Sequence, residues 1–154
     1  MPDENNTKRE YVFREKSSLS HYKAGAFVVR CIDSRFWKVA KHFVKSLGLK
    51  HIDPPYPAGG AKVFSSPFDE YETEHYLRQL AISIKLHHTE KVILFSHHDC
   101  GAYGGFANFG NSKKRELDFH RSEHTKAVKV IKDRFPDLEI ETYFIDGQGV
   151  IKTF

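Results

Sequence analysis

Residues 91–101 read KVILFSHHDCG, a run of apolar and β-branched residues that leads directly into histidine, aspartate and cysteine. A uniformly apolar run of this length is typical of a strand that is covered on both faces. A second such run, GAFVVRCI at residues 25–32, also places a cysteine at its end. The two runs predict two buried strands whose ends carry metal-binding or reactive side chains.

Helical patterns separate these strands along the chain. Between residues 36 and 48 the apolar residues recur at intervals of three and four, as on the buried face of an amphipathic helix. A second helix is expected to begin with Ser66 as its N-cap, Pro67 at its first position and Asp69 as a capping acid. The expected strands are residues 25–32, 91–96, 138–145 and 150–154, and the expected helices are residues 36–48, 66–88 and 117–135. A proline-rich loop or edge strand at residues 51–60 follows the first helix, and a glycine-rich loop at residues 101–110 precedes the third.

Alternation of strands with helices predicts an α/β fold, namely a single domain with a mainly parallel β-sheet flanked by helices. The length of 154 residues and the hydrophobic content of 40% fit one globular domain. In parallel sheets the ligand site lies beyond the carboxyl ends of the strands. Cys31 and Cys100 both fall there, so we expect them to meet at one edge of the sheet.

Residues 1–22 differ from the rest of the chain because they are polar and charged. Their apolar anchors are Tyr11, Val12, Phe13 and Leu19. We expect this segment to form an N-terminal arm that packs on another surface. It holds no apolar stretch of the kind that a secretion signal needs, and two cysteines do not make a disulfide scaffold, so the predicted location is cytoplasmic.

Charge and hydropathy argue against two classes of partner. The formal net charge is +4, but basic residues are mixed with acidic ones, as in KKRE at residues 113–116, and form no stripe that would bind nucleic acid. The longest apolar runs, such as residues 26–29 and 92–95, are far shorter than the ~20 residues that a bilayer crossing needs. The sequence therefore predicts neither a nucleic-acid nor a membrane partner.

Two thiols and one imidazole at the strand ends form a candidate zinc site. Zinc prefers thiolate sulfur and histidine nitrogen in tetrahedral geometry, and three protein ligands leave a fourth position for water. Taken singly, a cysteine at a strand end is more often a small buried hydrophobic residue. The joint placement of Cys31, His97 and Cys100 favours the metal site.

Cys-x-Asp-Ser-Arg at residues 31–35, followed by His-x-x-Cys-Gly at residues 97–101, resembles the zinc-site signature of the β-class carbonic anhydrases. The resemblance covers most of the chain from about residue 25 to the end. It implies that zinc is bound by Cys31, His97 and Cys100, with one ion per chain.

The resemblance also implies a hydrogen-bonded catalytic dyad of Asp33 and Arg35. The guanidinium fork would hold Asp33 as a carboxylate, which can only accept a hydrogen bond and would orient a zinc-bound hydroxide toward CO₂. In some members of the family the equivalent aspartate instead swings onto the metal. Asp33 therefore has two possible roles, between which the sequence does not choose.

The function that the resemblance implies is zinc-dependent, reversible hydration of CO₂ to bicarbonate and a proton, catalysed by a carbonate dehydratase, a lyase. Residues 23–154 would form the catalytic domain, and the family exchanges N-terminal arms between subunits, so a homodimer or a larger homo-oligomer is expected. Two alternatives stay open: a hydrolase of CS₂ or COS on the same site, and a non-catalytic zinc-stabilised binding or regulatory protein.

One loop departs from the pattern of the family. Many members carry Arg-Asn-Ala-Gly after the second strand, whereas residues 56–60 here read YPAGG and keep only the Ala-Gly pair. The change affects the predicted pocket wall and substrate range and leaves the metal ligands in place. Gly59 is predicted to contact substrate through its backbone, although a simple turn glycine explains it equally well.

Three further histidines, His98, His120 and His124, are candidates for a functional role. Residues 120–124, HRSEH, match the inverted zinc-protease motif, but little chain follows to supply a third ligand. We therefore expect His124 on the buried stripe of a helix and His120 at its border. His98, between two predicted ligands, is either a proton relay or an exposed bystander.

Overall fold

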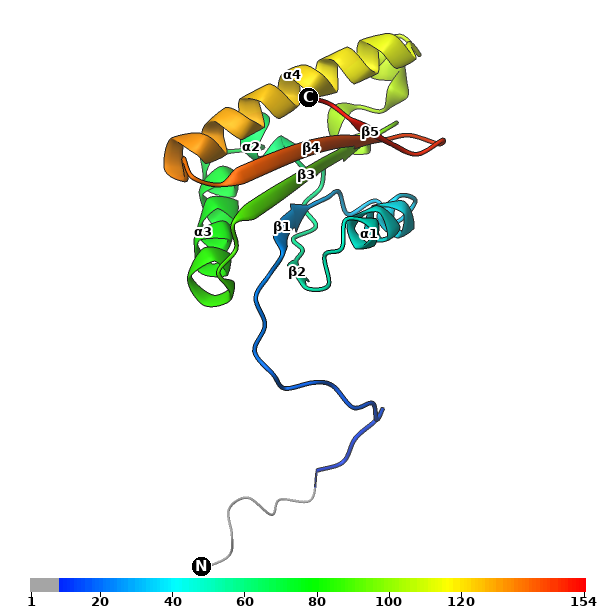
Figure 1. Ribbon diagram of the computed structural model, residues 1–154. Coiled ribbons are helices and arrows are strands. Elements are labelled where there is room, and N and C mark those ends of the chain that lie inside the picture. The colour runs from blue at the N-terminus through cyan, green and yellow to red at the C-terminus, as the bar shows by residue number, and fades with distance from the viewer. Residues whose placement is uncertain (1–8) are drawn as a thin grey trace, which may run out of the picture.

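Five strands form one sheet in the computed structural model, which describes residues 9–154 (Figure 1). The strands are β1 (Ala26–Val29), β2 (Ile52–Asp53), β3 (Lys91–His97), β4 (Glu139–Ile145) and β5 (Val150–Lys152). Their order is β2-β1-β3-β4-β5, and β5 runs antiparallel to β4 while all other pairs are parallel. The predicted mainly parallel α/β sheet is confirmed.

Helices cover both faces of this sheet. They are α1 (Trp37–Ser46), α2 (Lys62–Ser65), α3 (Glu70–His87) and α4 (Lys113–Arg134), with two short 3₁₀ helices, η1 (Gly101–Tyr103) and η2 (Phe106–Phe109). α1 packs on one face of the sheet, and α2, α3 and α4 pack on the other. The two central strands are therefore buried on both sides, as their uniformly apolar sequences predict.

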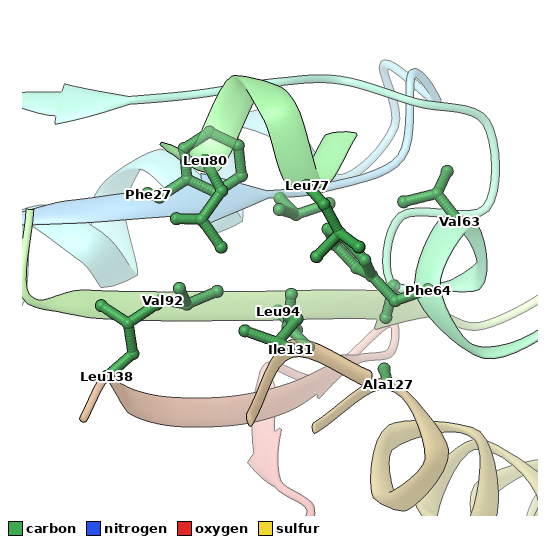
Figure 2. Close-up of a cluster of buried hydrophobic side chains, with 12 residues drawn as sticks. Phe27, Val63, Phe64, Leu77, Leu80, Val92, Leu94, Ala127, Ile131 and Leu138 are labelled. Carbon is green, nitrogen blue, oxygen red and sulfur yellow. The ribbon is translucent and has the colours of Figure 1, made fainter. Parts of the chain in front are cut away.

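Alternate residues of the central strands supply the two halves of the core. Val92 and Leu94 face α3 and α4, whereas Ile93 and Phe95 face α1. Figure 2 shows the first half, in which Leu80 of α3 and Ile131 of α4 close on β3. This packing fixes the relative positions of β1 and β3, and so of the residues that follow their carboxyl ends.

The start of α3 differs from the prediction. Ser66 is not the N-cap: it follows α2, and its hydroxyl donates to Glu123 of α4 at 2.5 Å. The helix begins at Glu70, and the N-cap is Asp69, whose carboxylate accepts from the backbone N–H of Glu72 at 2.9 Å. The predicted capping role of Asp69 is therefore confirmed, but the positions assigned to Ser66 and Pro67 are wrong.

The N-terminal arm leaves the body of the molecule without forming a helix or a strand between residues 9 and 22 (Figure 1). The predicted anchors Tyr11, Val12, Phe13 and Leu19 are all exposed. Residues 1–8 of the predicted arm lie outside the described residues. Within residues 9–154 no helix is both long enough and apolar enough to cross a membrane.

Candidate metal centre

Three potential metal ligands converge beyond the carboxyl ends of β1 and β3. Cys31 follows β1 by two residues, His97 ends β3, and Cys100 lies in the turn that follows. β1 and β3 are neighbouring parallel strands, so their ends meet at one edge. The ligand atoms of the three side chains lie within 4.8 Å of one another, and all three residues are buried. The structure thus brings together the residues that the sequence predicts as ligands.

The orientation of His97 suits a metal ligand. Its Nδ1 lies 2.7 Å from the carbonyl oxygen of His98, which can only accept, so Nδ1 carries the proton. Its Nε2 is buried and has no hydrogen-bond partner. The ring stacks on Phe36, with 4.6 Å between centroids. A buried nitrogen lone pair without a partner, beside two thiols, is the donor set that a tetrahedral zinc ion satisfies.

The two thiols shift each other's pKa in opposite directions. A hydrogen bond from the Cys100 thiol lowers the pKa of Cys31, and the same contact raises the pKa of Cys100. The Cys31 sulfur also lies 3.2 Å from the backbone nitrogen of Gly59, which donates to it. Both contacts lower the pKa of Cys31 and so favour its thiolate, the form in which cysteine binds a metal.

Asp33 and Arg35 form the predicted hydrogen-bonded pair. Arg35 Nη2 lies 2.7 Å and Nε 3.1 Å from Asp33 Oδ2, and the Arg35 backbone N–H donates to Oδ1 at 2.9 Å. The guanidinium of Arg35 lowers the pKa of Asp33 to about 2. Asp33 Oδ2 lies 3.8 Å from His97 Nε2, so an ionised carboxylate borders the three-ligand cluster.

A second partner of Arg35 was missed in the sequence. Asp99 Oδ2 accepts from Arg35 Nη1 at 3.2 Å, and its carbonyl oxygen accepts from Nη2 at 3.1 Å. Asp99 has a φ of 55°, in the left-handed region that aspartate tolerates better than most residues. The sequence shows an aspartate, a residue typical of turns, between His97 and Cys100. It does not show that this aspartate pairs with Arg35, 64 positions away.

Gly59 lies against a ligand. Its amide is bonded to Cys31, and its φ is 86°. A Cβ at this position would come within 2.7 Å of the Lys62 side chain, so the backbone approach depends on glycine. The predicted contact of Gly59 with substrate stays a prediction. In the same divergent loop, the Tyr56 ring lies under the guanidinium of Arg30, at 3.8 Å.

A small cavity of about 10 Å³ adjoins the cluster. This is roughly the space that one water molecule requires. Its wall combines ligand and dyad residues with apolar side chains, namely Arg30, Cys31, Asp33, Phe36, Ala40, Phe95, Ser96, His97 and Ile145. Residues of the cluster and Asp33 of the Asp33–Arg35 pair therefore share this cavity with apolar side chains of α1 and of the strands.

The HRSEH motif forms no metal site in the part of the chain that the structure describes. His124 is buried as predicted, and it bonds Ser96 and Thr153 at 2.8 Å each. His120 is also fully buried, so its predicted border position is wrong. Burial lowers the pKa of His120 to about 4 and that of His124 to about 3, which keeps both rings neutral. The rings of Tyr103 and Phe109 cover His120.

His98 is not an isolated bystander. Its Nδ1 lies 2.7 Å from a carboxylate oxygen of the buried Glu116, and its side chain is 30% exposed. Sequence reasoning missed Glu116 because a glutamate in the first turns of a helix is normally solvated.

Comparison with known families assigns the chain. A family model described as "Putative carbonic anhydrase" matches residues 22–154. This chain belongs to that carbonic anhydrase family. It is similar to an uncharacterized protein of Rickettsia bellii, with 27% identity over 151 residues, which is 92% of this chain and 90% of the relative.

Solved structures share the fold of this carbonic anhydrase family member. The carbonic anhydrase of Streptococcus mutans matches with a TM-score of 0.61 and 21% identity, over 91% of this chain and 88% of that one. A β-carbonic anhydrase of Trichomonas vaginalis gives the same TM-score and coverage at 14% identity. A carbon disulfide hydrolase gives 0.55 and 14%, over 86% and 80% of the two chains. The resemblance to β-class carbonic anhydrases is confirmed at the level of fold.

Proposed function

We propose that this protein catalyses the reversible hydration of CO₂ to bicarbonate and a proton, with one zinc ion held by Cys31, His97 and Cys100. The observation that carries the proposal is the buried, unpartnered Nε2 of His97 beside two thiols. This donor set suits zinc, and three protein ligands leave one position open, as in catalytic rather than structural sites.

Asp33 and Arg35 would orient the reacting groups. Zinc, when bound in such a site, lowers the pKa of a coordinated water toward neutrality. Asp33 is held ionised by Arg35 and can only accept a hydrogen bond, so it orients the attacking nucleophile instead of competing for its proton. The apolar wall at Phe36 and Ile145 would receive CO₂.

Two other functions would use the same residues. Hydrolysis of CS₂ or COS needs the same nucleophile and an equally apolar approach, and a non-catalytic zinc protein would keep only the ligands. The likeness to a carbon disulfide hydrolase extends to the fold and does not favour that substrate.

Stopped-flow measurement of CO₂ hydration on zinc-loaded protein tests the proposal, with hydrogen sulfide release from CS₂ and COS measured in parallel. We expect zinc-dependent CO₂ hydration that Cys31→Ser abolishes. Faster turnover of the sulfur compounds would favour the hydrolase. One bound zinc without turnover of any of the three would favour the binding protein.

We also propose that two copies pair through the N-terminal arm. A groove of about 700 Å³ runs along α1 and β2, and its apolar floor includes Val28, Val44 and Ile52. Its rim is basic, at Arg30, Lys41, Lys45 and Lys50. In the arm, the exposed Tyr11–Phe13 segment offers apolar side chains that this apolar floor would cover in a second copy.

Light scattering at micromolar concentration tests this pairing. We expect a homodimer or a larger assembly that dissociates when residues 1–21 are deleted. A monomer in both forms would contradict it. A cytoplasmic location and the lack of a nucleic-acid partner stay predictions.

A further inference from the structure

We infer that Glu116 of α4 is a positioning residue, which holds the turn between His97 and Cys100 in the geometry that metal binding needs. Both of its carboxylate oxygens contact this turn. Oε2 lies 2.7 Å from His98 Nδ1, and Oε1 accepts from the backbone N–H of Asp99 at 2.8 Å. The inference rests on the proposed function, because it concerns the support of the proposed metal site.

The burial of Glu116 requires such partners. The residue is 1% exposed, and a buried carboxylate is strongly destabilising unless its oxygens are hydrogen-bonded. Within the described residues its one ionic partner is His98, and no lysine or arginine pairs with it. Glu116 lies four residues after the N-cap Ser112, where the helix dipole favours a negative charge. α4 thus supplies a carboxylate whose two oxygens both bond the turn between His97 and Cys100.

One peptide group connects Glu116 to the metal ligand His97. The carbonyl of the His98–Asp99 peptide accepts from His97 Nδ1 at 2.7 Å, and the N–H of the same peptide donates to Glu116. A hydrogen bond from this N–H to a carboxylate polarises the peptide and makes its carbonyl a stronger acceptor. Glu116 therefore acts through the peptide to hold the His97 ring and its Nδ1 proton, which leaves Nε2 free for a metal.

The same peptide lies in a strained turn. Asp99 has a φ of 55°, and this left-handed conformation has a free-energy cost even for aspartate, so contacts with its surroundings stabilise it. Arg35, which also pairs with Asp33, donates hydrogen bonds to the carboxylate and to the backbone carbonyl oxygen of Asp99. Glu116 holds the amide from the side of α4. The backbone between the two proposed ligands is thus held by side chains from two separate segments of the chain.

Groups that orient metal ligands typically change metal affinity by roughly 10- to 100-fold when they are altered. We therefore expect Glu116→Gln, which keeps the shape and removes the charge, to release zinc about 10- to 100-fold faster than wild type. Cobalt-substituted protein should show an altered ligand-field spectrum in the same variant, because the His97 ring is no longer held.

Glu123→Gln is the matched control. Glu123 is an equally buried glutamate two turns further along the same helix, but its partners are Ser65, Ser66, Tyr103 and Lys126. Both variants should lower the melting temperature of the metal-free protein. Zinc release to a chromophoric chelator should accelerate only in Glu116→Gln, and Glu123→Gln should stay within about threefold of wild type. Equal release rates in the two variants would overturn the inference.

A measurement on the unaltered chain covers the case in which Glu116→Gln does not fold. In the metal-free wild type, the Asp99 amide proton should exchange with solvent at least about 100-fold more slowly than an unbonded amide, because it is bonded to a buried carboxylate. Fast exchange at Asp99 would overturn the inference. A wild-type chain with a protected Asp99 amide that takes up no zinc would instead overturn the proposed function.

Discussion

The two ends of the parallel sheet each carry a polar cluster with a histidine and an aspartate, but the two clusters are bonded differently. At the amino end, the amino-edge cluster comprises Tyr22, Asp53, Ser83, His87 and Thr89. Asp53 accepts from the Tyr22 hydroxyl at 2.6 Å, from Ser83 at 2.6 Å and from His87 Nδ1 at 2.7 Å, and Ser83 also bonds Thr89. At the carboxyl end, His97 Nε2 has no partner.

This difference distinguishes the amino-edge cluster, which is structural, from the candidate metal site at the carboxyl end. Serine, histidine and aspartate in contact suggest a catalytic triad, but Ser83 bonds the carboxylate of Asp53 and not the imidazole of His87, so the amino-edge cluster lacks a nucleophile–base pair. Its polar groups satisfy one another. The carboxyl-end cluster keeps a buried imidazole nitrogen without a partner beside two thiols, and a metal ion would complete this set.

The largest expected effect is the loss of the metal at the carboxyl end. Cys31→Ser removes a thiolate from a three-ligand set, so zinc should fall from about one ion per chain to near zero, and CO₂ hydration should fall to the uncatalysed rate. Elemental analysis and stopped-flow assays check this. A metal-free wild type that still turns over would contradict the site itself, as would a Cys31→Ser variant that keeps its zinc.

Asp33→Asn should give the next largest effect. The amide is nearly isosteric but can donate a hydrogen bond, so it no longer dictates the orientation of the nucleophile, and Arg35 loses its ionic partner. By analogy with the removal of one preorganised hydrogen-bonding group, kcat should fall about 10²- to 10³-fold, roughly 3–4 kcal/mol, with zinc content unchanged.

The zinc content of Asp33→Asn decides between the two roles of this residue. Zinc loss would make Asp33 a metal ligand, and wild-type activity at full occupancy would exclude the dyad mechanism.

The sequence was sufficient for the placement of Cys31, His97 and Cys100. Uniformly apolar strands are typical of the interior of a parallel sheet, and neighbouring parallel strands end at the same edge. That inference needs only the positions of the strand ends. The Asp33–Arg35 pair was instead implied by the resemblance to the β-class carbonic anhydrases, and the hydrogen bonds between the two side chains agree with it.

Contacts that depend on the rotation and register of a helix were not predictable. Glu116 accepts a hydrogen bond from Asp99, in the turn between His97 and Cys100. Ser66 bonds Glu123, 57 residues away, and does not cap α3. Both contacts depend on how α4 packs on the sheet. Periodicity identified the buried face of α4, yet the full burial of His120 depends on the rings of Tyr103 and Phe109, which come from separate short helices.

Asp53→Asn should affect stability and leave the metal site unchanged. The Asp53 carboxylate accepts three hydrogen bonds, whereas the NH₂ group of asparagine would face donor groups and could not accept from them. The free energy of unfolding should therefore fall by about 2–4 kcal/mol. Urea titration of the metal-free protein at pH 7 measures this, with the exposed Asp118→Asn as a control that should change it by less than about 0.5 kcal/mol. Loss of zinc from Asp53→Asn would show that the two ends of the sheet are coupled.

Tyr22→Phe is the smallest and most specific test of the amino-edge cluster. The Tyr22 ring stacks on His51 and packs at a tilt against His87, and phenylalanine keeps that packing while removing one hydrogen bond to Asp53. Loss of one hydrogen bond to a charged acceptor should lower the free energy of unfolding by about 1.5 kcal/mol at pH 7. The exposed Tyr71→Phe should change it by less than about 0.5 kcal/mol.

The pH dependence of the Tyr22→Phe effect identifies its cause. Burial opposes ionisation of Asp53, but hydrogen bonds from Ser83, Tyr22 and His87 hold its pKa below the usual value. A carboxyl with a lowered folded-state pKa stabilises the protein above its unfolded pKa of about 3.9, and this contribution is lost as the pH falls through the folded-state pKa. The difference between wild type and Tyr22→Phe should therefore be constant above about pH 5 and shrink below pH 4. A difference that stays constant down to pH 2.5 would mean that the hydroxyl does not stabilise the ionised carboxylate.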